Sequence, residues 1–295
     1  MSWGWLTKST FFSIGLAASI LLGAWLWYIH ENARETRIIF LSVGEGDAIL
    51  ITKGNNQILV DGGREGKRLL AHLGGQVPFY DRKIETVIAT HPDADHIGGL
   101  PELFRKYQVD AFLSTGAKSD TETVKLLERE LEMDFHGMRL PAFRGAGIAL
   151  PDGGVFRILF PETPLPERVD ETNRGSVVGR FTYGETSFLL TGDLPDEEAY
   201  LPLLEPVTVL KAAHHGSRYS TSEAWLSEVT PREAIISVGE NSYGHPSPDV
   251  LERLTERGVR ILRTDELGDI VYRCRPEWQG CRRDEEPTLA SLRKK

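Results

Sequence analysis

Residues 90–100, with the sequence THPDADHIGGL, place four side chains that commonly bind metal ions within six positions. His91, Asp93, Asp95 and His96 form the pattern H-x-D-x-D-H. In an extended loop, residues 91 and 93 point the same way, and a turn at 95 and 96 brings the next two side chains round. A structural zinc usually takes four ligands of the cysteine or histidine type, so two carboxylates favour two adjacent metal positions. Two alternatives stay open: Asp95 as the N-cap of the helix that follows, and the histidines as solvated loop residues.

Further carboxylate and imidazole groups follow predicted strands elsewhere in the chain. LLTGD ends a strand in Asp193, a position suited to a carboxylate that bridges two metals, with an ordinary Asx turn as the alternative. LKAAHHGS places His214 and His215 at another strand end, and SVGENSYGHPS places His245 beyond a third. Five of the eight histidines thus occur at strand-to-loop junctions, which makes them candidate metal ligands.

Short apolar runs alternate with amphipathic stretches along the rest of the chain. The runs predict strands, and the stretches with apolar residues every three or four positions predict helices. The predicted strands cover residues 37–43, 47–52, 56–63, 85–90, 176–184, 186–193, 207–217, 234–239 and 259–264. The predicted helices cover residues 64–75, 97–107, 123–133 and 248–258, and two more begin near 197 and 222. Both halves contain a strand pair followed by a buried strand, which predicts an α/β fold of two sheets with helices outside.

Composition limits the class of protein. With 295 residues and 40% apolar content, the chain is long enough for one large core or two modest ones. The net charge of −9 argues against a broad basic surface that holds nucleic acid by phosphate neutralisation alone. An anionic substrate therefore requires local cations, either metal ions or a few lysines and arginines.

The N-terminal region contains a run without charged residues over residues 10–29. At about 1.5 Å per residue, this run is just long enough to cross a bilayer as a helix. Aromatic residues lie at both ends of the run, as at membrane interfaces. No small-x-small cleavage site follows, so an uncleaved anchor is favoured over a signal peptide or a buried helix. Basic residues on the two flanks nearly tie, so they do not fix the orientation.

Cys274 and Cys281 are the only cysteines of the chain. An even pair at short spacing fits a disulfide-closed loop in an oxidising compartment, with two reduced thiols as the alternative. Together with the apolar run, the pair favours a folded domain outside the cytoplasmic membrane.

Six motifs, in order, resemble the metallo-β-lactamase superfamily and, within it, the extracytoplasmic hydrolase domain of the ComEC family of DNA-uptake proteins. They are LSVGEGDAILI, ILVDGG, THPDADHIGGL, SFLLTGD, LKAAHHGSRYSTSEAWL and AIISVGENSYGHPSPDVLERL. The resemblance covers about residues 37–272 and implies the αββα four-layer sandwich. It implies that metal is held by the H-x-D-x-D-H residues, by Asp193 and by one or more of His214, His215 and His245. We assign His214 and His245 as ligands, and Asp61 in the VDGG turn as a residue that supports the site.

With this resemblance, the chain divides into four parts. We expect a membrane anchor helix over residues 1–30, a linker over 31–36, a metallo-β-lactamase-like hydrolase domain over 37–283 and a polar tail over 284–295.

Two departures from the superfamily pattern affect the expected metal. Asp93 stands where the usual H-x-H-x-D-H motif has a histidine, and oxygen in place of nitrogen shifts preference from zinc towards manganese or magnesium. The superfamily also has a metal-binding histidine between this motif and the bridging aspartate. Here His136 lacks the expected context, and Asn173 lies nearer the expected place, beside the substrate. We therefore expect two divalent cations per chain, with Mn²⁺ favoured and Zn²⁺ or Mg²⁺ as alternatives.

Such a site implies hydrolysis by a metal-activated hydroxide that attacks a phosphorus or carbonyl centre. The candidate catalytic residues are Asp95, His215 and His245, because an uncoordinated histidine can protonate the leaving oxygen. Further candidate substrate contacts are Lys211, Ser217 and Arg218, although each basic residue fits a solvated surface charge equally well.

The resemblance, rather than the ligand pattern, implies DNA as the substrate and a competence-related role for a membrane-anchored phosphodiesterase or nuclease. One alternative is a metallo-hydrolase of a carboxylic ester, lactone or β-lactam. A second is a non-catalytic domain that binds metal or DNA. One helix cannot form a transport channel, so we expect the chain to act alone or with a separate membrane channel protein.

Overall fold

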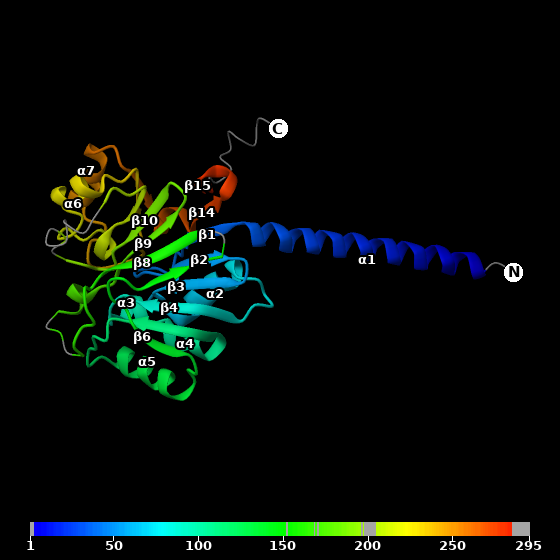
Figure 1. Cartoon of the computed structure of the whole chain (residues 1–295), viewed down its shortest axis with the longest axis horizontal. Helices are drawn as coiled ribbons and strands as arrows, with labels where there is room; N and C mark the ends of the chain where they lie inside the picture. Colours follow the sequence, from blue (N-terminus) through cyan, green and yellow to red (C-terminus); the bar gives the residue numbers. More distant parts are fainter. Residues whose placement is uncertain are drawn as a thin grey trace.

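The structure is a computed structural model that describes residues 3–284, apart from residues 152, 168, 170, 196 and 198–204. Within this part of the chain, two β-sheets face each other, helices cover both outer faces, and one long helix projects from the domain (Figure 1). This arrangement confirms the predicted αββα sandwich. The helix predicted from about residue 197 and all but the first residue of the predicted tail lie outside the described residues.

The first sheet contains most of the N-terminal half of the domain together with the C-terminal hairpin. Its strands are, in spatial order, β15 (Gly280–Arg283), β14 (Ile270–Arg275), β1 (Thr36–Phe40), β2 (Ile49–Lys53), β3 (Asn56–Val60), β4 (Lys83–Ala89), β5 (Gln108–Ser114) and β6 (Met138–Pro141). Strands β3 to β6 run parallel, so their carboxyl ends meet at one edge of the sheet. The other pairs are antiparallel.

The second sheet belongs to the C-terminal half. Its strands are, in spatial order, β13 (Arg260–Arg263), β12 (Glu233–Ile236), β11 (Val209–Lys211), β10 (Thr186–Leu190), β9 (Val178–Tyr183), β8 (Gly154–Phe160) and β7 (Gly147–Ala149). Strands β10 to β13 run parallel. A strand covered on both faces has no residue open to solvent, and every residue of β10 is buried, including Thr186 and Ser187 at its start.

Apolar side chains fill the space between the sheets. Phe40 of the first sheet and Phe188 of the second are fully buried. Phe188 packs edge to face on Tyr272 of the opposite sheet, with ring centroids 5.1 Å apart. Aromatic pairs of this kind combine a large buried area with a favourable ring geometry, so they fix the two sheets against each other.

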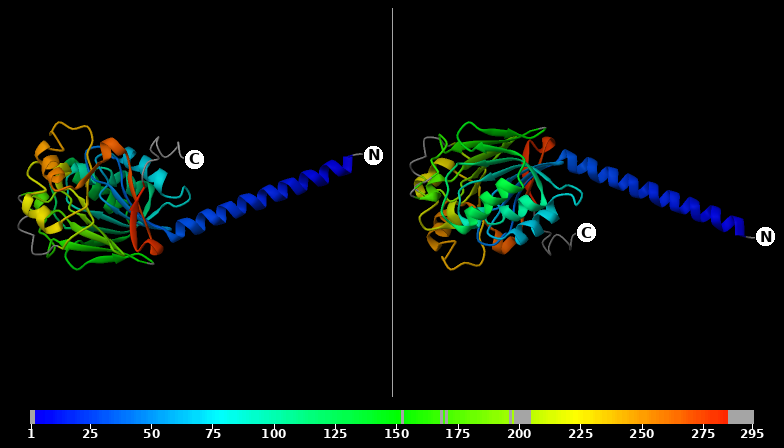
Figure 2. Two further views of the ribbon diagram at one scale, coloured as in Figure 1. Left: turned by 90° about the horizontal axis from the view of Figure 1, so that it is seen from above. Right: turned by 90° about the horizontal axis from the view of Figure 1, so that it is seen from below.

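Amphipathic helices cover the outer faces of the sandwich (Figure 2). They are α2 (Gly66–Gln76), α4 (Leu100–Lys106) and α5 (Glu122–Met133) on the first sheet, and α6 (Glu223–Val229) and α7 (Pro248–Glu256) on the second. In α5 the buried residues Val124, Leu127 and Leu131 recur every three or four positions and so form one apolar stripe. Thr121 caps this helix, because its side chain accepts a hydrogen bond from the backbone N–H of Val124.

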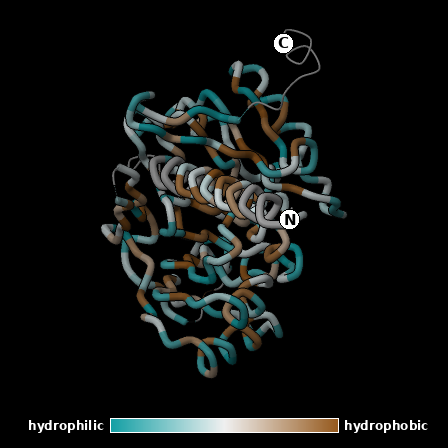
Figure 3. Tube along the Cα trace, turned by 90° about the vertical axis from the view of Figure 1, so that its right-hand side faces the viewer, coloured by the Kyte–Doolittle hydropathy of each residue, from teal (hydrophilic) through white to brown (hydrophobic). Residues whose placement is uncertain are grey.

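The long helix α1 (Trp3–Arg34) extends away from the domain, and none of the residues in its segment Thr10–Trp27 is buried. This segment has a mean hydropathy of 1.7 and is long and apolar enough to cross a membrane. In Figure 3, which looks along the helix, most of α1 is coloured white to brown. The prediction of a linker over residues 31–36 is wrong, because α1 continues to Arg34 and β1 begins at Thr36. Extending a helix that already exists requires no new nucleation, which explains why this polar stretch stays helical.

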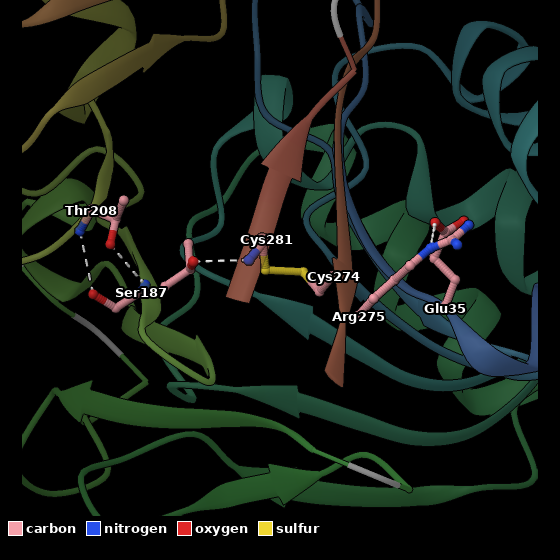
Figure 4. Close-up of a disulfide and its surroundings, with 7 residues drawn as sticks. Glu35, Ser187, Thr208, Cys274, Arg275 and Cys281 are labelled. Atoms are coloured by element: carbon pink, nitrogen blue, oxygen red, sulfur yellow. Dashed lines mark hydrogen bonds and ion pairs between the residues drawn. A yellow bond between two sulfur atoms is a disulfide. The ribbon is translucent and has the colours of Figure 1, made fainter. Parts of the chain in front are cut away.

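The junction between α1 and the domain is held by ion pairs. Glu35, the one residue between α1 and β1, is buried and accepts a hydrogen bond from Arg273 at 2.6 Å. It also accepts one from Arg275 at 3.0 Å (Figure 4). Thr36 at the start of β1 lies opposite Lys53 at the end of β2, which in turn lies opposite Asn56 at the start of β3. We call the end of the sandwich that contains these residues the α1 edge. The opposite end, where β4, β10 and β11 finish, is the far edge.

Cys274 of β14 and Cys281 of β15 face each other and form a disulfide (Figure 4). The bonded state is the first of the two states that the sequence allowed. Cys274 is fully buried, and the backbone N–H of Cys281 donates to the hydroxyl of Thr186 in the second sheet. The disulfide therefore holds the edge strand β15 where the two sheets meet.

Reduction of this disulfide is expected to lower the free energy of unfolding of the domain by about 2 kcal/mol. This is the contribution expected when so short a closed loop limits the conformational entropy of the unfolded chain. The melting temperature of the detergent-solubilised chain should fall by about 5 °C in dithiothreitol. The double variant Cys274→Ala/Cys281→Ala should melt at the lower temperature and not respond to the reductant. An equal response of both proteins would contradict the prediction.

Candidate metal centre

The first sheet supplies one half of the candidate site at the far edge. Strand β4 ends at Ala89, and the chain turns through His91 and Asp93 into α3 (Ala94–Ile97), which contains His96. Nε2 of His91 lies 3.9 Å from the Asp93 carboxylate. His91 and His96 are buried, and their ring centroids lie 4.0 Å apart. The loop and its short helix therefore hold both imidazoles at the end of the strand, as the sequence predicted.

Asp61 orients His96 by a direct contact and His91 through Thr90. It accepts hydrogen bonds from the backbone N–H of Thr90 at 2.8 Å and from the hydroxyl of Thr90 at 2.7 Å, and it lies 2.8 Å from Nδ1 of His96. Because the Thr90 hydroxyl donates its proton to Asp61, its oxygen accepts from Nδ1 of His91, 3.0 Å away. Both histidines thus carry a proton on Nδ1, which leaves Nε2 as the nitrogen that can ligate a metal once it is free of a proton.

The second sheet supplies the other half. Asp193 follows β10, and His214 and His215 lie in the turn η3 (Ala213–Gly216) after β11. Both histidines adopt left-handed backbone conformations, with φ of 49° and 53°. Such angles are uncommon for residues other than glycine and often occur at functional sites. Nδ1 of His215 lies 2.8 Å from the carbonyl oxygen of Ser237, which can only accept, so Nε2 is again the nitrogen that can ligate a metal.

Three imidazoles converge on Asp193. Nε2 of His96, of His215 and of His91 lie 3.2, 3.4 and 4.0 Å from its carboxylate oxygens. These three nitrogens and Oδ1 of Asp193 are buried, yet none forms a well-aligned hydrogen bond with any residue that the structure describes. Buried polar atoms almost always have a partner, so four orphaned atoms that face one another fit a cation.

The donors form three overlapping groups that all include His96, one of which consists of Asp47, Asp61 and His96. In the other two, the donor atoms of His91, His96 and Asp193 lie within 4.8 Å of one another, and so do those of Asp95, His96 and His215. Asp193 touches members of both of these groups. The geometry therefore brings His91, Asp95, His96, His215 and Asp193 close enough together to hold a divalent cation.

The charges of the cluster are mutually dependent. Burial alone would raise the pKa of Asp193, but His215 and His96 hold it well below its ordinary value. Burial alone would lower the pKa of His96, but Asp193 and Asp61 raise it well above its ordinary value. Burial, with His96 nearby, holds the pKa of His91 well below its ordinary value. A divalent cation at the cluster would compete with the proton on His96, as expected when metal ligands must be deprotonated.

Lys211 lies in the interior next to the cluster, and its side chain is not open to solvent. Its side chain is fully buried, pairs with Asp47 and donates a hydrogen bond to the carbonyl of Gly192 at 3.1 Å. Burial alone would lower the pKa of Lys211, but Asp47 and Asp193 raise it above its ordinary value. The prediction of Lys211 as a substrate contact is wrong, because a buried, paired ammonium cannot meet a phosphate in solution.

The histidine roles inferred from the sequence also change. His215, predicted to move protons, is buried among the candidate ligands, whereas His214, predicted as a ligand, is 36% exposed and lies 3.8 Å from Asp193. His245, predicted both as a ligand and as catalytic, belongs to none of these groups. Its Nδ1 lies 3.1 Å from Glu45, and its ring centroid lies 5.5 Å from that of His214. The geometry adds His215 to the candidate ligands, and His214, which lies nearer to Asp193 than His91 does, stays a candidate on the more exposed side, next to His245.

The other predicted substrate contacts are Asn173, Ser217 and Arg218. Asn173 is half-buried in the turn η1 (Thr172–Gly175), where Thr172 rather than Asn173 donates to the Asp93 carboxylate, at 2.7 Å. Ser217 is buried, so its hydroxyl is not open to a substrate, whereas Arg218 is exposed. The guanidinium of Arg64, half-exposed, lies 3.4 Å from Asp95 and adds a second cation near the site.

The sequence reasoning missed Glu45, Asp47, Arg64 and Thr172. The motif LSVGEGDAILI carried a signal for the first two, because two acids surround a glycine directly before a strand. Gly46 has a φ of 131°, and a Cβ there would lie 2.1 Å from the carbonyl oxygen of Asp95. Only glycine permits this approach, which brings Glu45 and Asp47 to the site.

The variant Asp61→Asn is expected to bind Mn²⁺ about 10 to 100 times more weakly. The reason is that the NH₂ group of asparagine would face the donating hydroxyl of Thr90 or the donating Nδ1–H of His96, where the carboxylate of Asp61 accepts from both. Free Mn²⁺, measured by electron paramagnetic resonance during titration, tests this. Asp81→Asn is the matched control, since Asp81 is also buried but contacts Gln57 near the α1 edge. Equal affinity of the two variants would show that Asp61 does not support metal ligation.

Comparisons with known proteins agree with this geometry. A sequence model described as the Metallo-beta-lactamase superfamily matches residues 41–240. The chain is 32% identical over 262 residues to ComE operon protein 3 of Bacillus subtilis (strain 168), which covers 81% of this chain and 33% of that protein. It is 28% identical over 269 residues to Competence protein ComA of Neisseria gonorrhoeae, covering 86% of this chain and 35% of that protein. The chain thus spans about a third of the length of these relatives.

Among solved structures, the metallo-beta-lactamase fold protein YhfI from Bacillus subtilis superposes with a TM-score of 0.55 at 15% identity. The match covers 81% of this chain and 99% of that one, so the two share a fold.

Proposed function

This chain belongs to the metallo-β-lactamase superfamily, and on that premise we propose that it is a membrane-anchored, metal-dependent hydrolase that cleaves phosphodiester bonds in DNA. One observation carries the hydrolase part of the proposal. Three buried imidazole Nε2 atoms, each on a ring whose Nδ1 already has a hydrogen-bond partner, converge on the Asp193 carboxylate without well-aligned hydrogen-bond partners among the described residues.

The residues that would hold two divalent cations are His91, Asp93, Asp95, His96, His215 and the shared Asp193. Bound there, such cations would supply Lewis acidity and a water acidified to act near neutral pH. Asp93, with 38% of its side chain exposed, adds a hard oxygen donor at the open side, which favours Mn²⁺ or Mg²⁺ over Zn²⁺. Of these ions, Mn²⁺ remains our first choice.

Residues on the exposed side of the cluster would bind the substrate and move protons. Arg64 and Arg218 are exposed enough to contact the non-reacting phosphate oxygens, which guanidinium groups recognise well. His214 and His245 lie on the same side and carry ring nitrogens suited to protonating a leaving oxygen. Glu45 would hold His245 in position through its contact with Nδ1.

DNA as the substrate and a competence-related role are supported by the relatives named ComE operon protein 3 and Competence protein ComA. The apolar segment Thr10–Trp27 supports anchoring in a membrane. The disulfide between Cys274 and Cys281 supports a location outside the cytoplasm, because such bonds persist in oxidising compartments. A separate membrane channel protein would be the partner in DNA uptake.

The test uses the detergent-solubilised chain, stripped of metal and then supplied with Mn²⁺, Mg²⁺ or Zn²⁺ separately. Cleavage of single-stranded DNA and of bis-p-nitrophenyl phosphate is measured for the wild type and for Asp193→Ala. We expect metal-dependent cleavage of both substrates, lost in the variant.

The other outcomes separate the parts of the proposal. Cleavage of the small ester alone would retain the hydrolase and remove DNA as the substrate. Activity on neither, with metal still bound, would favour a carboxylic ester, lactone or β-lactam, or a domain that binds without catalysis.

A further inference from the structure

The α1 edge of the domain carries the exposed aromatic residues Phe79 and Tyr80 on one side of the point where α1 leaves, and the exposed Arg282 next to the half-buried Trp278 on the other. We infer that this face docks on the surface of the bilayer that α1 crosses, with anionic lipid head groups as its partner. The inference rests on the proposed anchoring by α1 and does not depend on the proposed hydrolase activity.

The length of α1 places the domain against the membrane. The apolar segment ends at Trp27, and the helix ends at Arg34. At about 1.5 Å per residue, the intervening helix spans about 10 Å. The head-group region on one side of a bilayer is about 5–8 Å thick, so the first strand begins at its outer boundary.

The junction leaves little freedom for the domain to swing away. Glu35, which is held by Arg273 and Arg275, is the one residue between the end of α1 and the start of β1. The orientation of α1 therefore fixes which face of the domain meets the lipid. That face is the α1 edge, while the candidate metal centre lies at the far edge.

One group of side chains extends from this junction through Trp278. Arg275 stacks over the indole ring at 5.0 Å, and Arg282 stacks over it at 4.9 Å. Trp278 closes the turn η4 (Pro276–Trp278) between β14 and β15. Among the described residues, no carboxylate pairs with Arg282, which leaves its guanidinium available to a lipid phosphate. Tryptophan and arginine both favour the boundary between hydrocarbon and water.

A second group lies on the other side of β1, in the loop between α2 and β4 (the cyan loop that points towards α1 in Figure 1). Phe79 is 83% exposed and Tyr80 is 45% exposed, and their rings pack edge to face at 5.4 Å. Asp81 ties this loop to the α1 edge by accepting a hydrogen bond from Gln57 of β3. The sheet order places β4 three strands from β1, about 14 Å away. The two groups therefore lie within one small area around the helix exit.

A nucleic-acid surface would use similar side chains, but two observations favour lipid. The patch surrounds the exit of the apolar helix, and it lies at the opposite end of the sandwich from the candidate metal centre. A strand of DNA bound here would be held away from the residues proposed to cleave it.

The experiment measures how deeply two positions lie in vesicles that carry the full-length chain. Phe79→Cys and Glu277→Cys are made separately and labelled with a nitroxide, and the native cysteines are protected as a disulfide. Each is reconstituted into phosphatidylcholine–phosphatidylglycerol vesicles. Collision with oxygen, which enters lipid, is compared with collision with a water-soluble nickel complex. Tyr219→Cys is the control, because Tyr219 is 82% exposed, like Phe79, but follows η3 near the far edge.

We expect the nickel complex to reach positions 79 and 277 several-fold less often than position 219, with the opposite order for oxygen. If the chain floats with the vesicles but all three labels are equally open to nickel, docking is wrong and anchoring stands. If the chain does not float with the vesicles, both fail, whatever its hydrolase activity. If a single-stranded oligonucleotide shields the labels and vesicles do not, the face binds nucleic acid instead.

Discussion

Replacing Asp193 by asparagine is expected to lower the rate of metal-dependent hydrolysis about 10³-fold, which corresponds to about 4 kcal/mol of transition-state stabilisation. The carboxylate lies within 3.2–4.0 Å of Nε2 of His96, His215 and His91. An amide of the same size keeps the volume but removes the charge that two cations would share. Metal content by mass spectrometry and the turnover of bis-p-nitrophenyl phosphate measure the effect.

Asp110→Asn serves as the control for this substitution. Asp110 is 40% exposed and pairs with Lys83 at the α1 edge, so its loss should leave turnover and metal content unchanged. Near-ultraviolet circular dichroism of both variants checks that the core is intact. If Asp193→Asn kept its metal and its turnover within about twofold, the cluster would not be the hydrolytic centre.

Replacing Lys211 by methionine is expected to destabilise the domain by about 3–5 kcal/mol, because Asp47 would be left as an uncompensated buried charge. For a domain of this size, the melting temperature should fall by about 10 °C. Thermal unfolding of the detergent-solubilised chain, followed by near-ultraviolet circular dichroism, tests this. Arg218→Met, the loss of an exposed cation seven residues later, should shift the melting temperature by no more than about 2 °C.

A second substitution distinguishes a buried charge from a substrate contact. Adding Asp47→Asn to Lys211→Met removes the uncompensated carboxylate, and we expect the double variant to recover at least half of the lost stability. A Lys211→Met protein with unchanged melting temperature and a raised KM would instead restore Lys211 as a phosphate contact.

The sequence predicted best those site residues whose positions depend on local structure. His91, Asp93, Asp95 and His96 are close in the chain, and one strand end and one short helix bring them together. Asp193 could be joined to them through its position at a strand end and through the resemblance to the superfamily, because it lies on the other sheet. The same reasoning gave the two-sheet fold, whose buried strands are apolar along their length.

Residues whose roles depend on distant partners were not predictable in this way. The sequence around Lys211 does not indicate whether its side chain faces solvent or pairs with Asp47, which lies 164 positions earlier in the chain. The choice between His214 and His215 depends on two left-handed backbone angles that no local preference of histidine favours. The helical end of α1 was missed because polar residues resemble a linker when the preceding helix is ignored.

The candidate centre takes His91 and His96 from the first sheet and Asp193 and His215 from the second, so a cation bound there would be a removable cross-link between the two halves of the fold. It would bind only when both sheets are docked, and its binding free energy would add to the stability of the docked state. In molecules that lack the ion, the two sheets would come apart more often, and proteases would cleave these molecules more often. The amount of this protein in a cell would then depend on the supply of its metal.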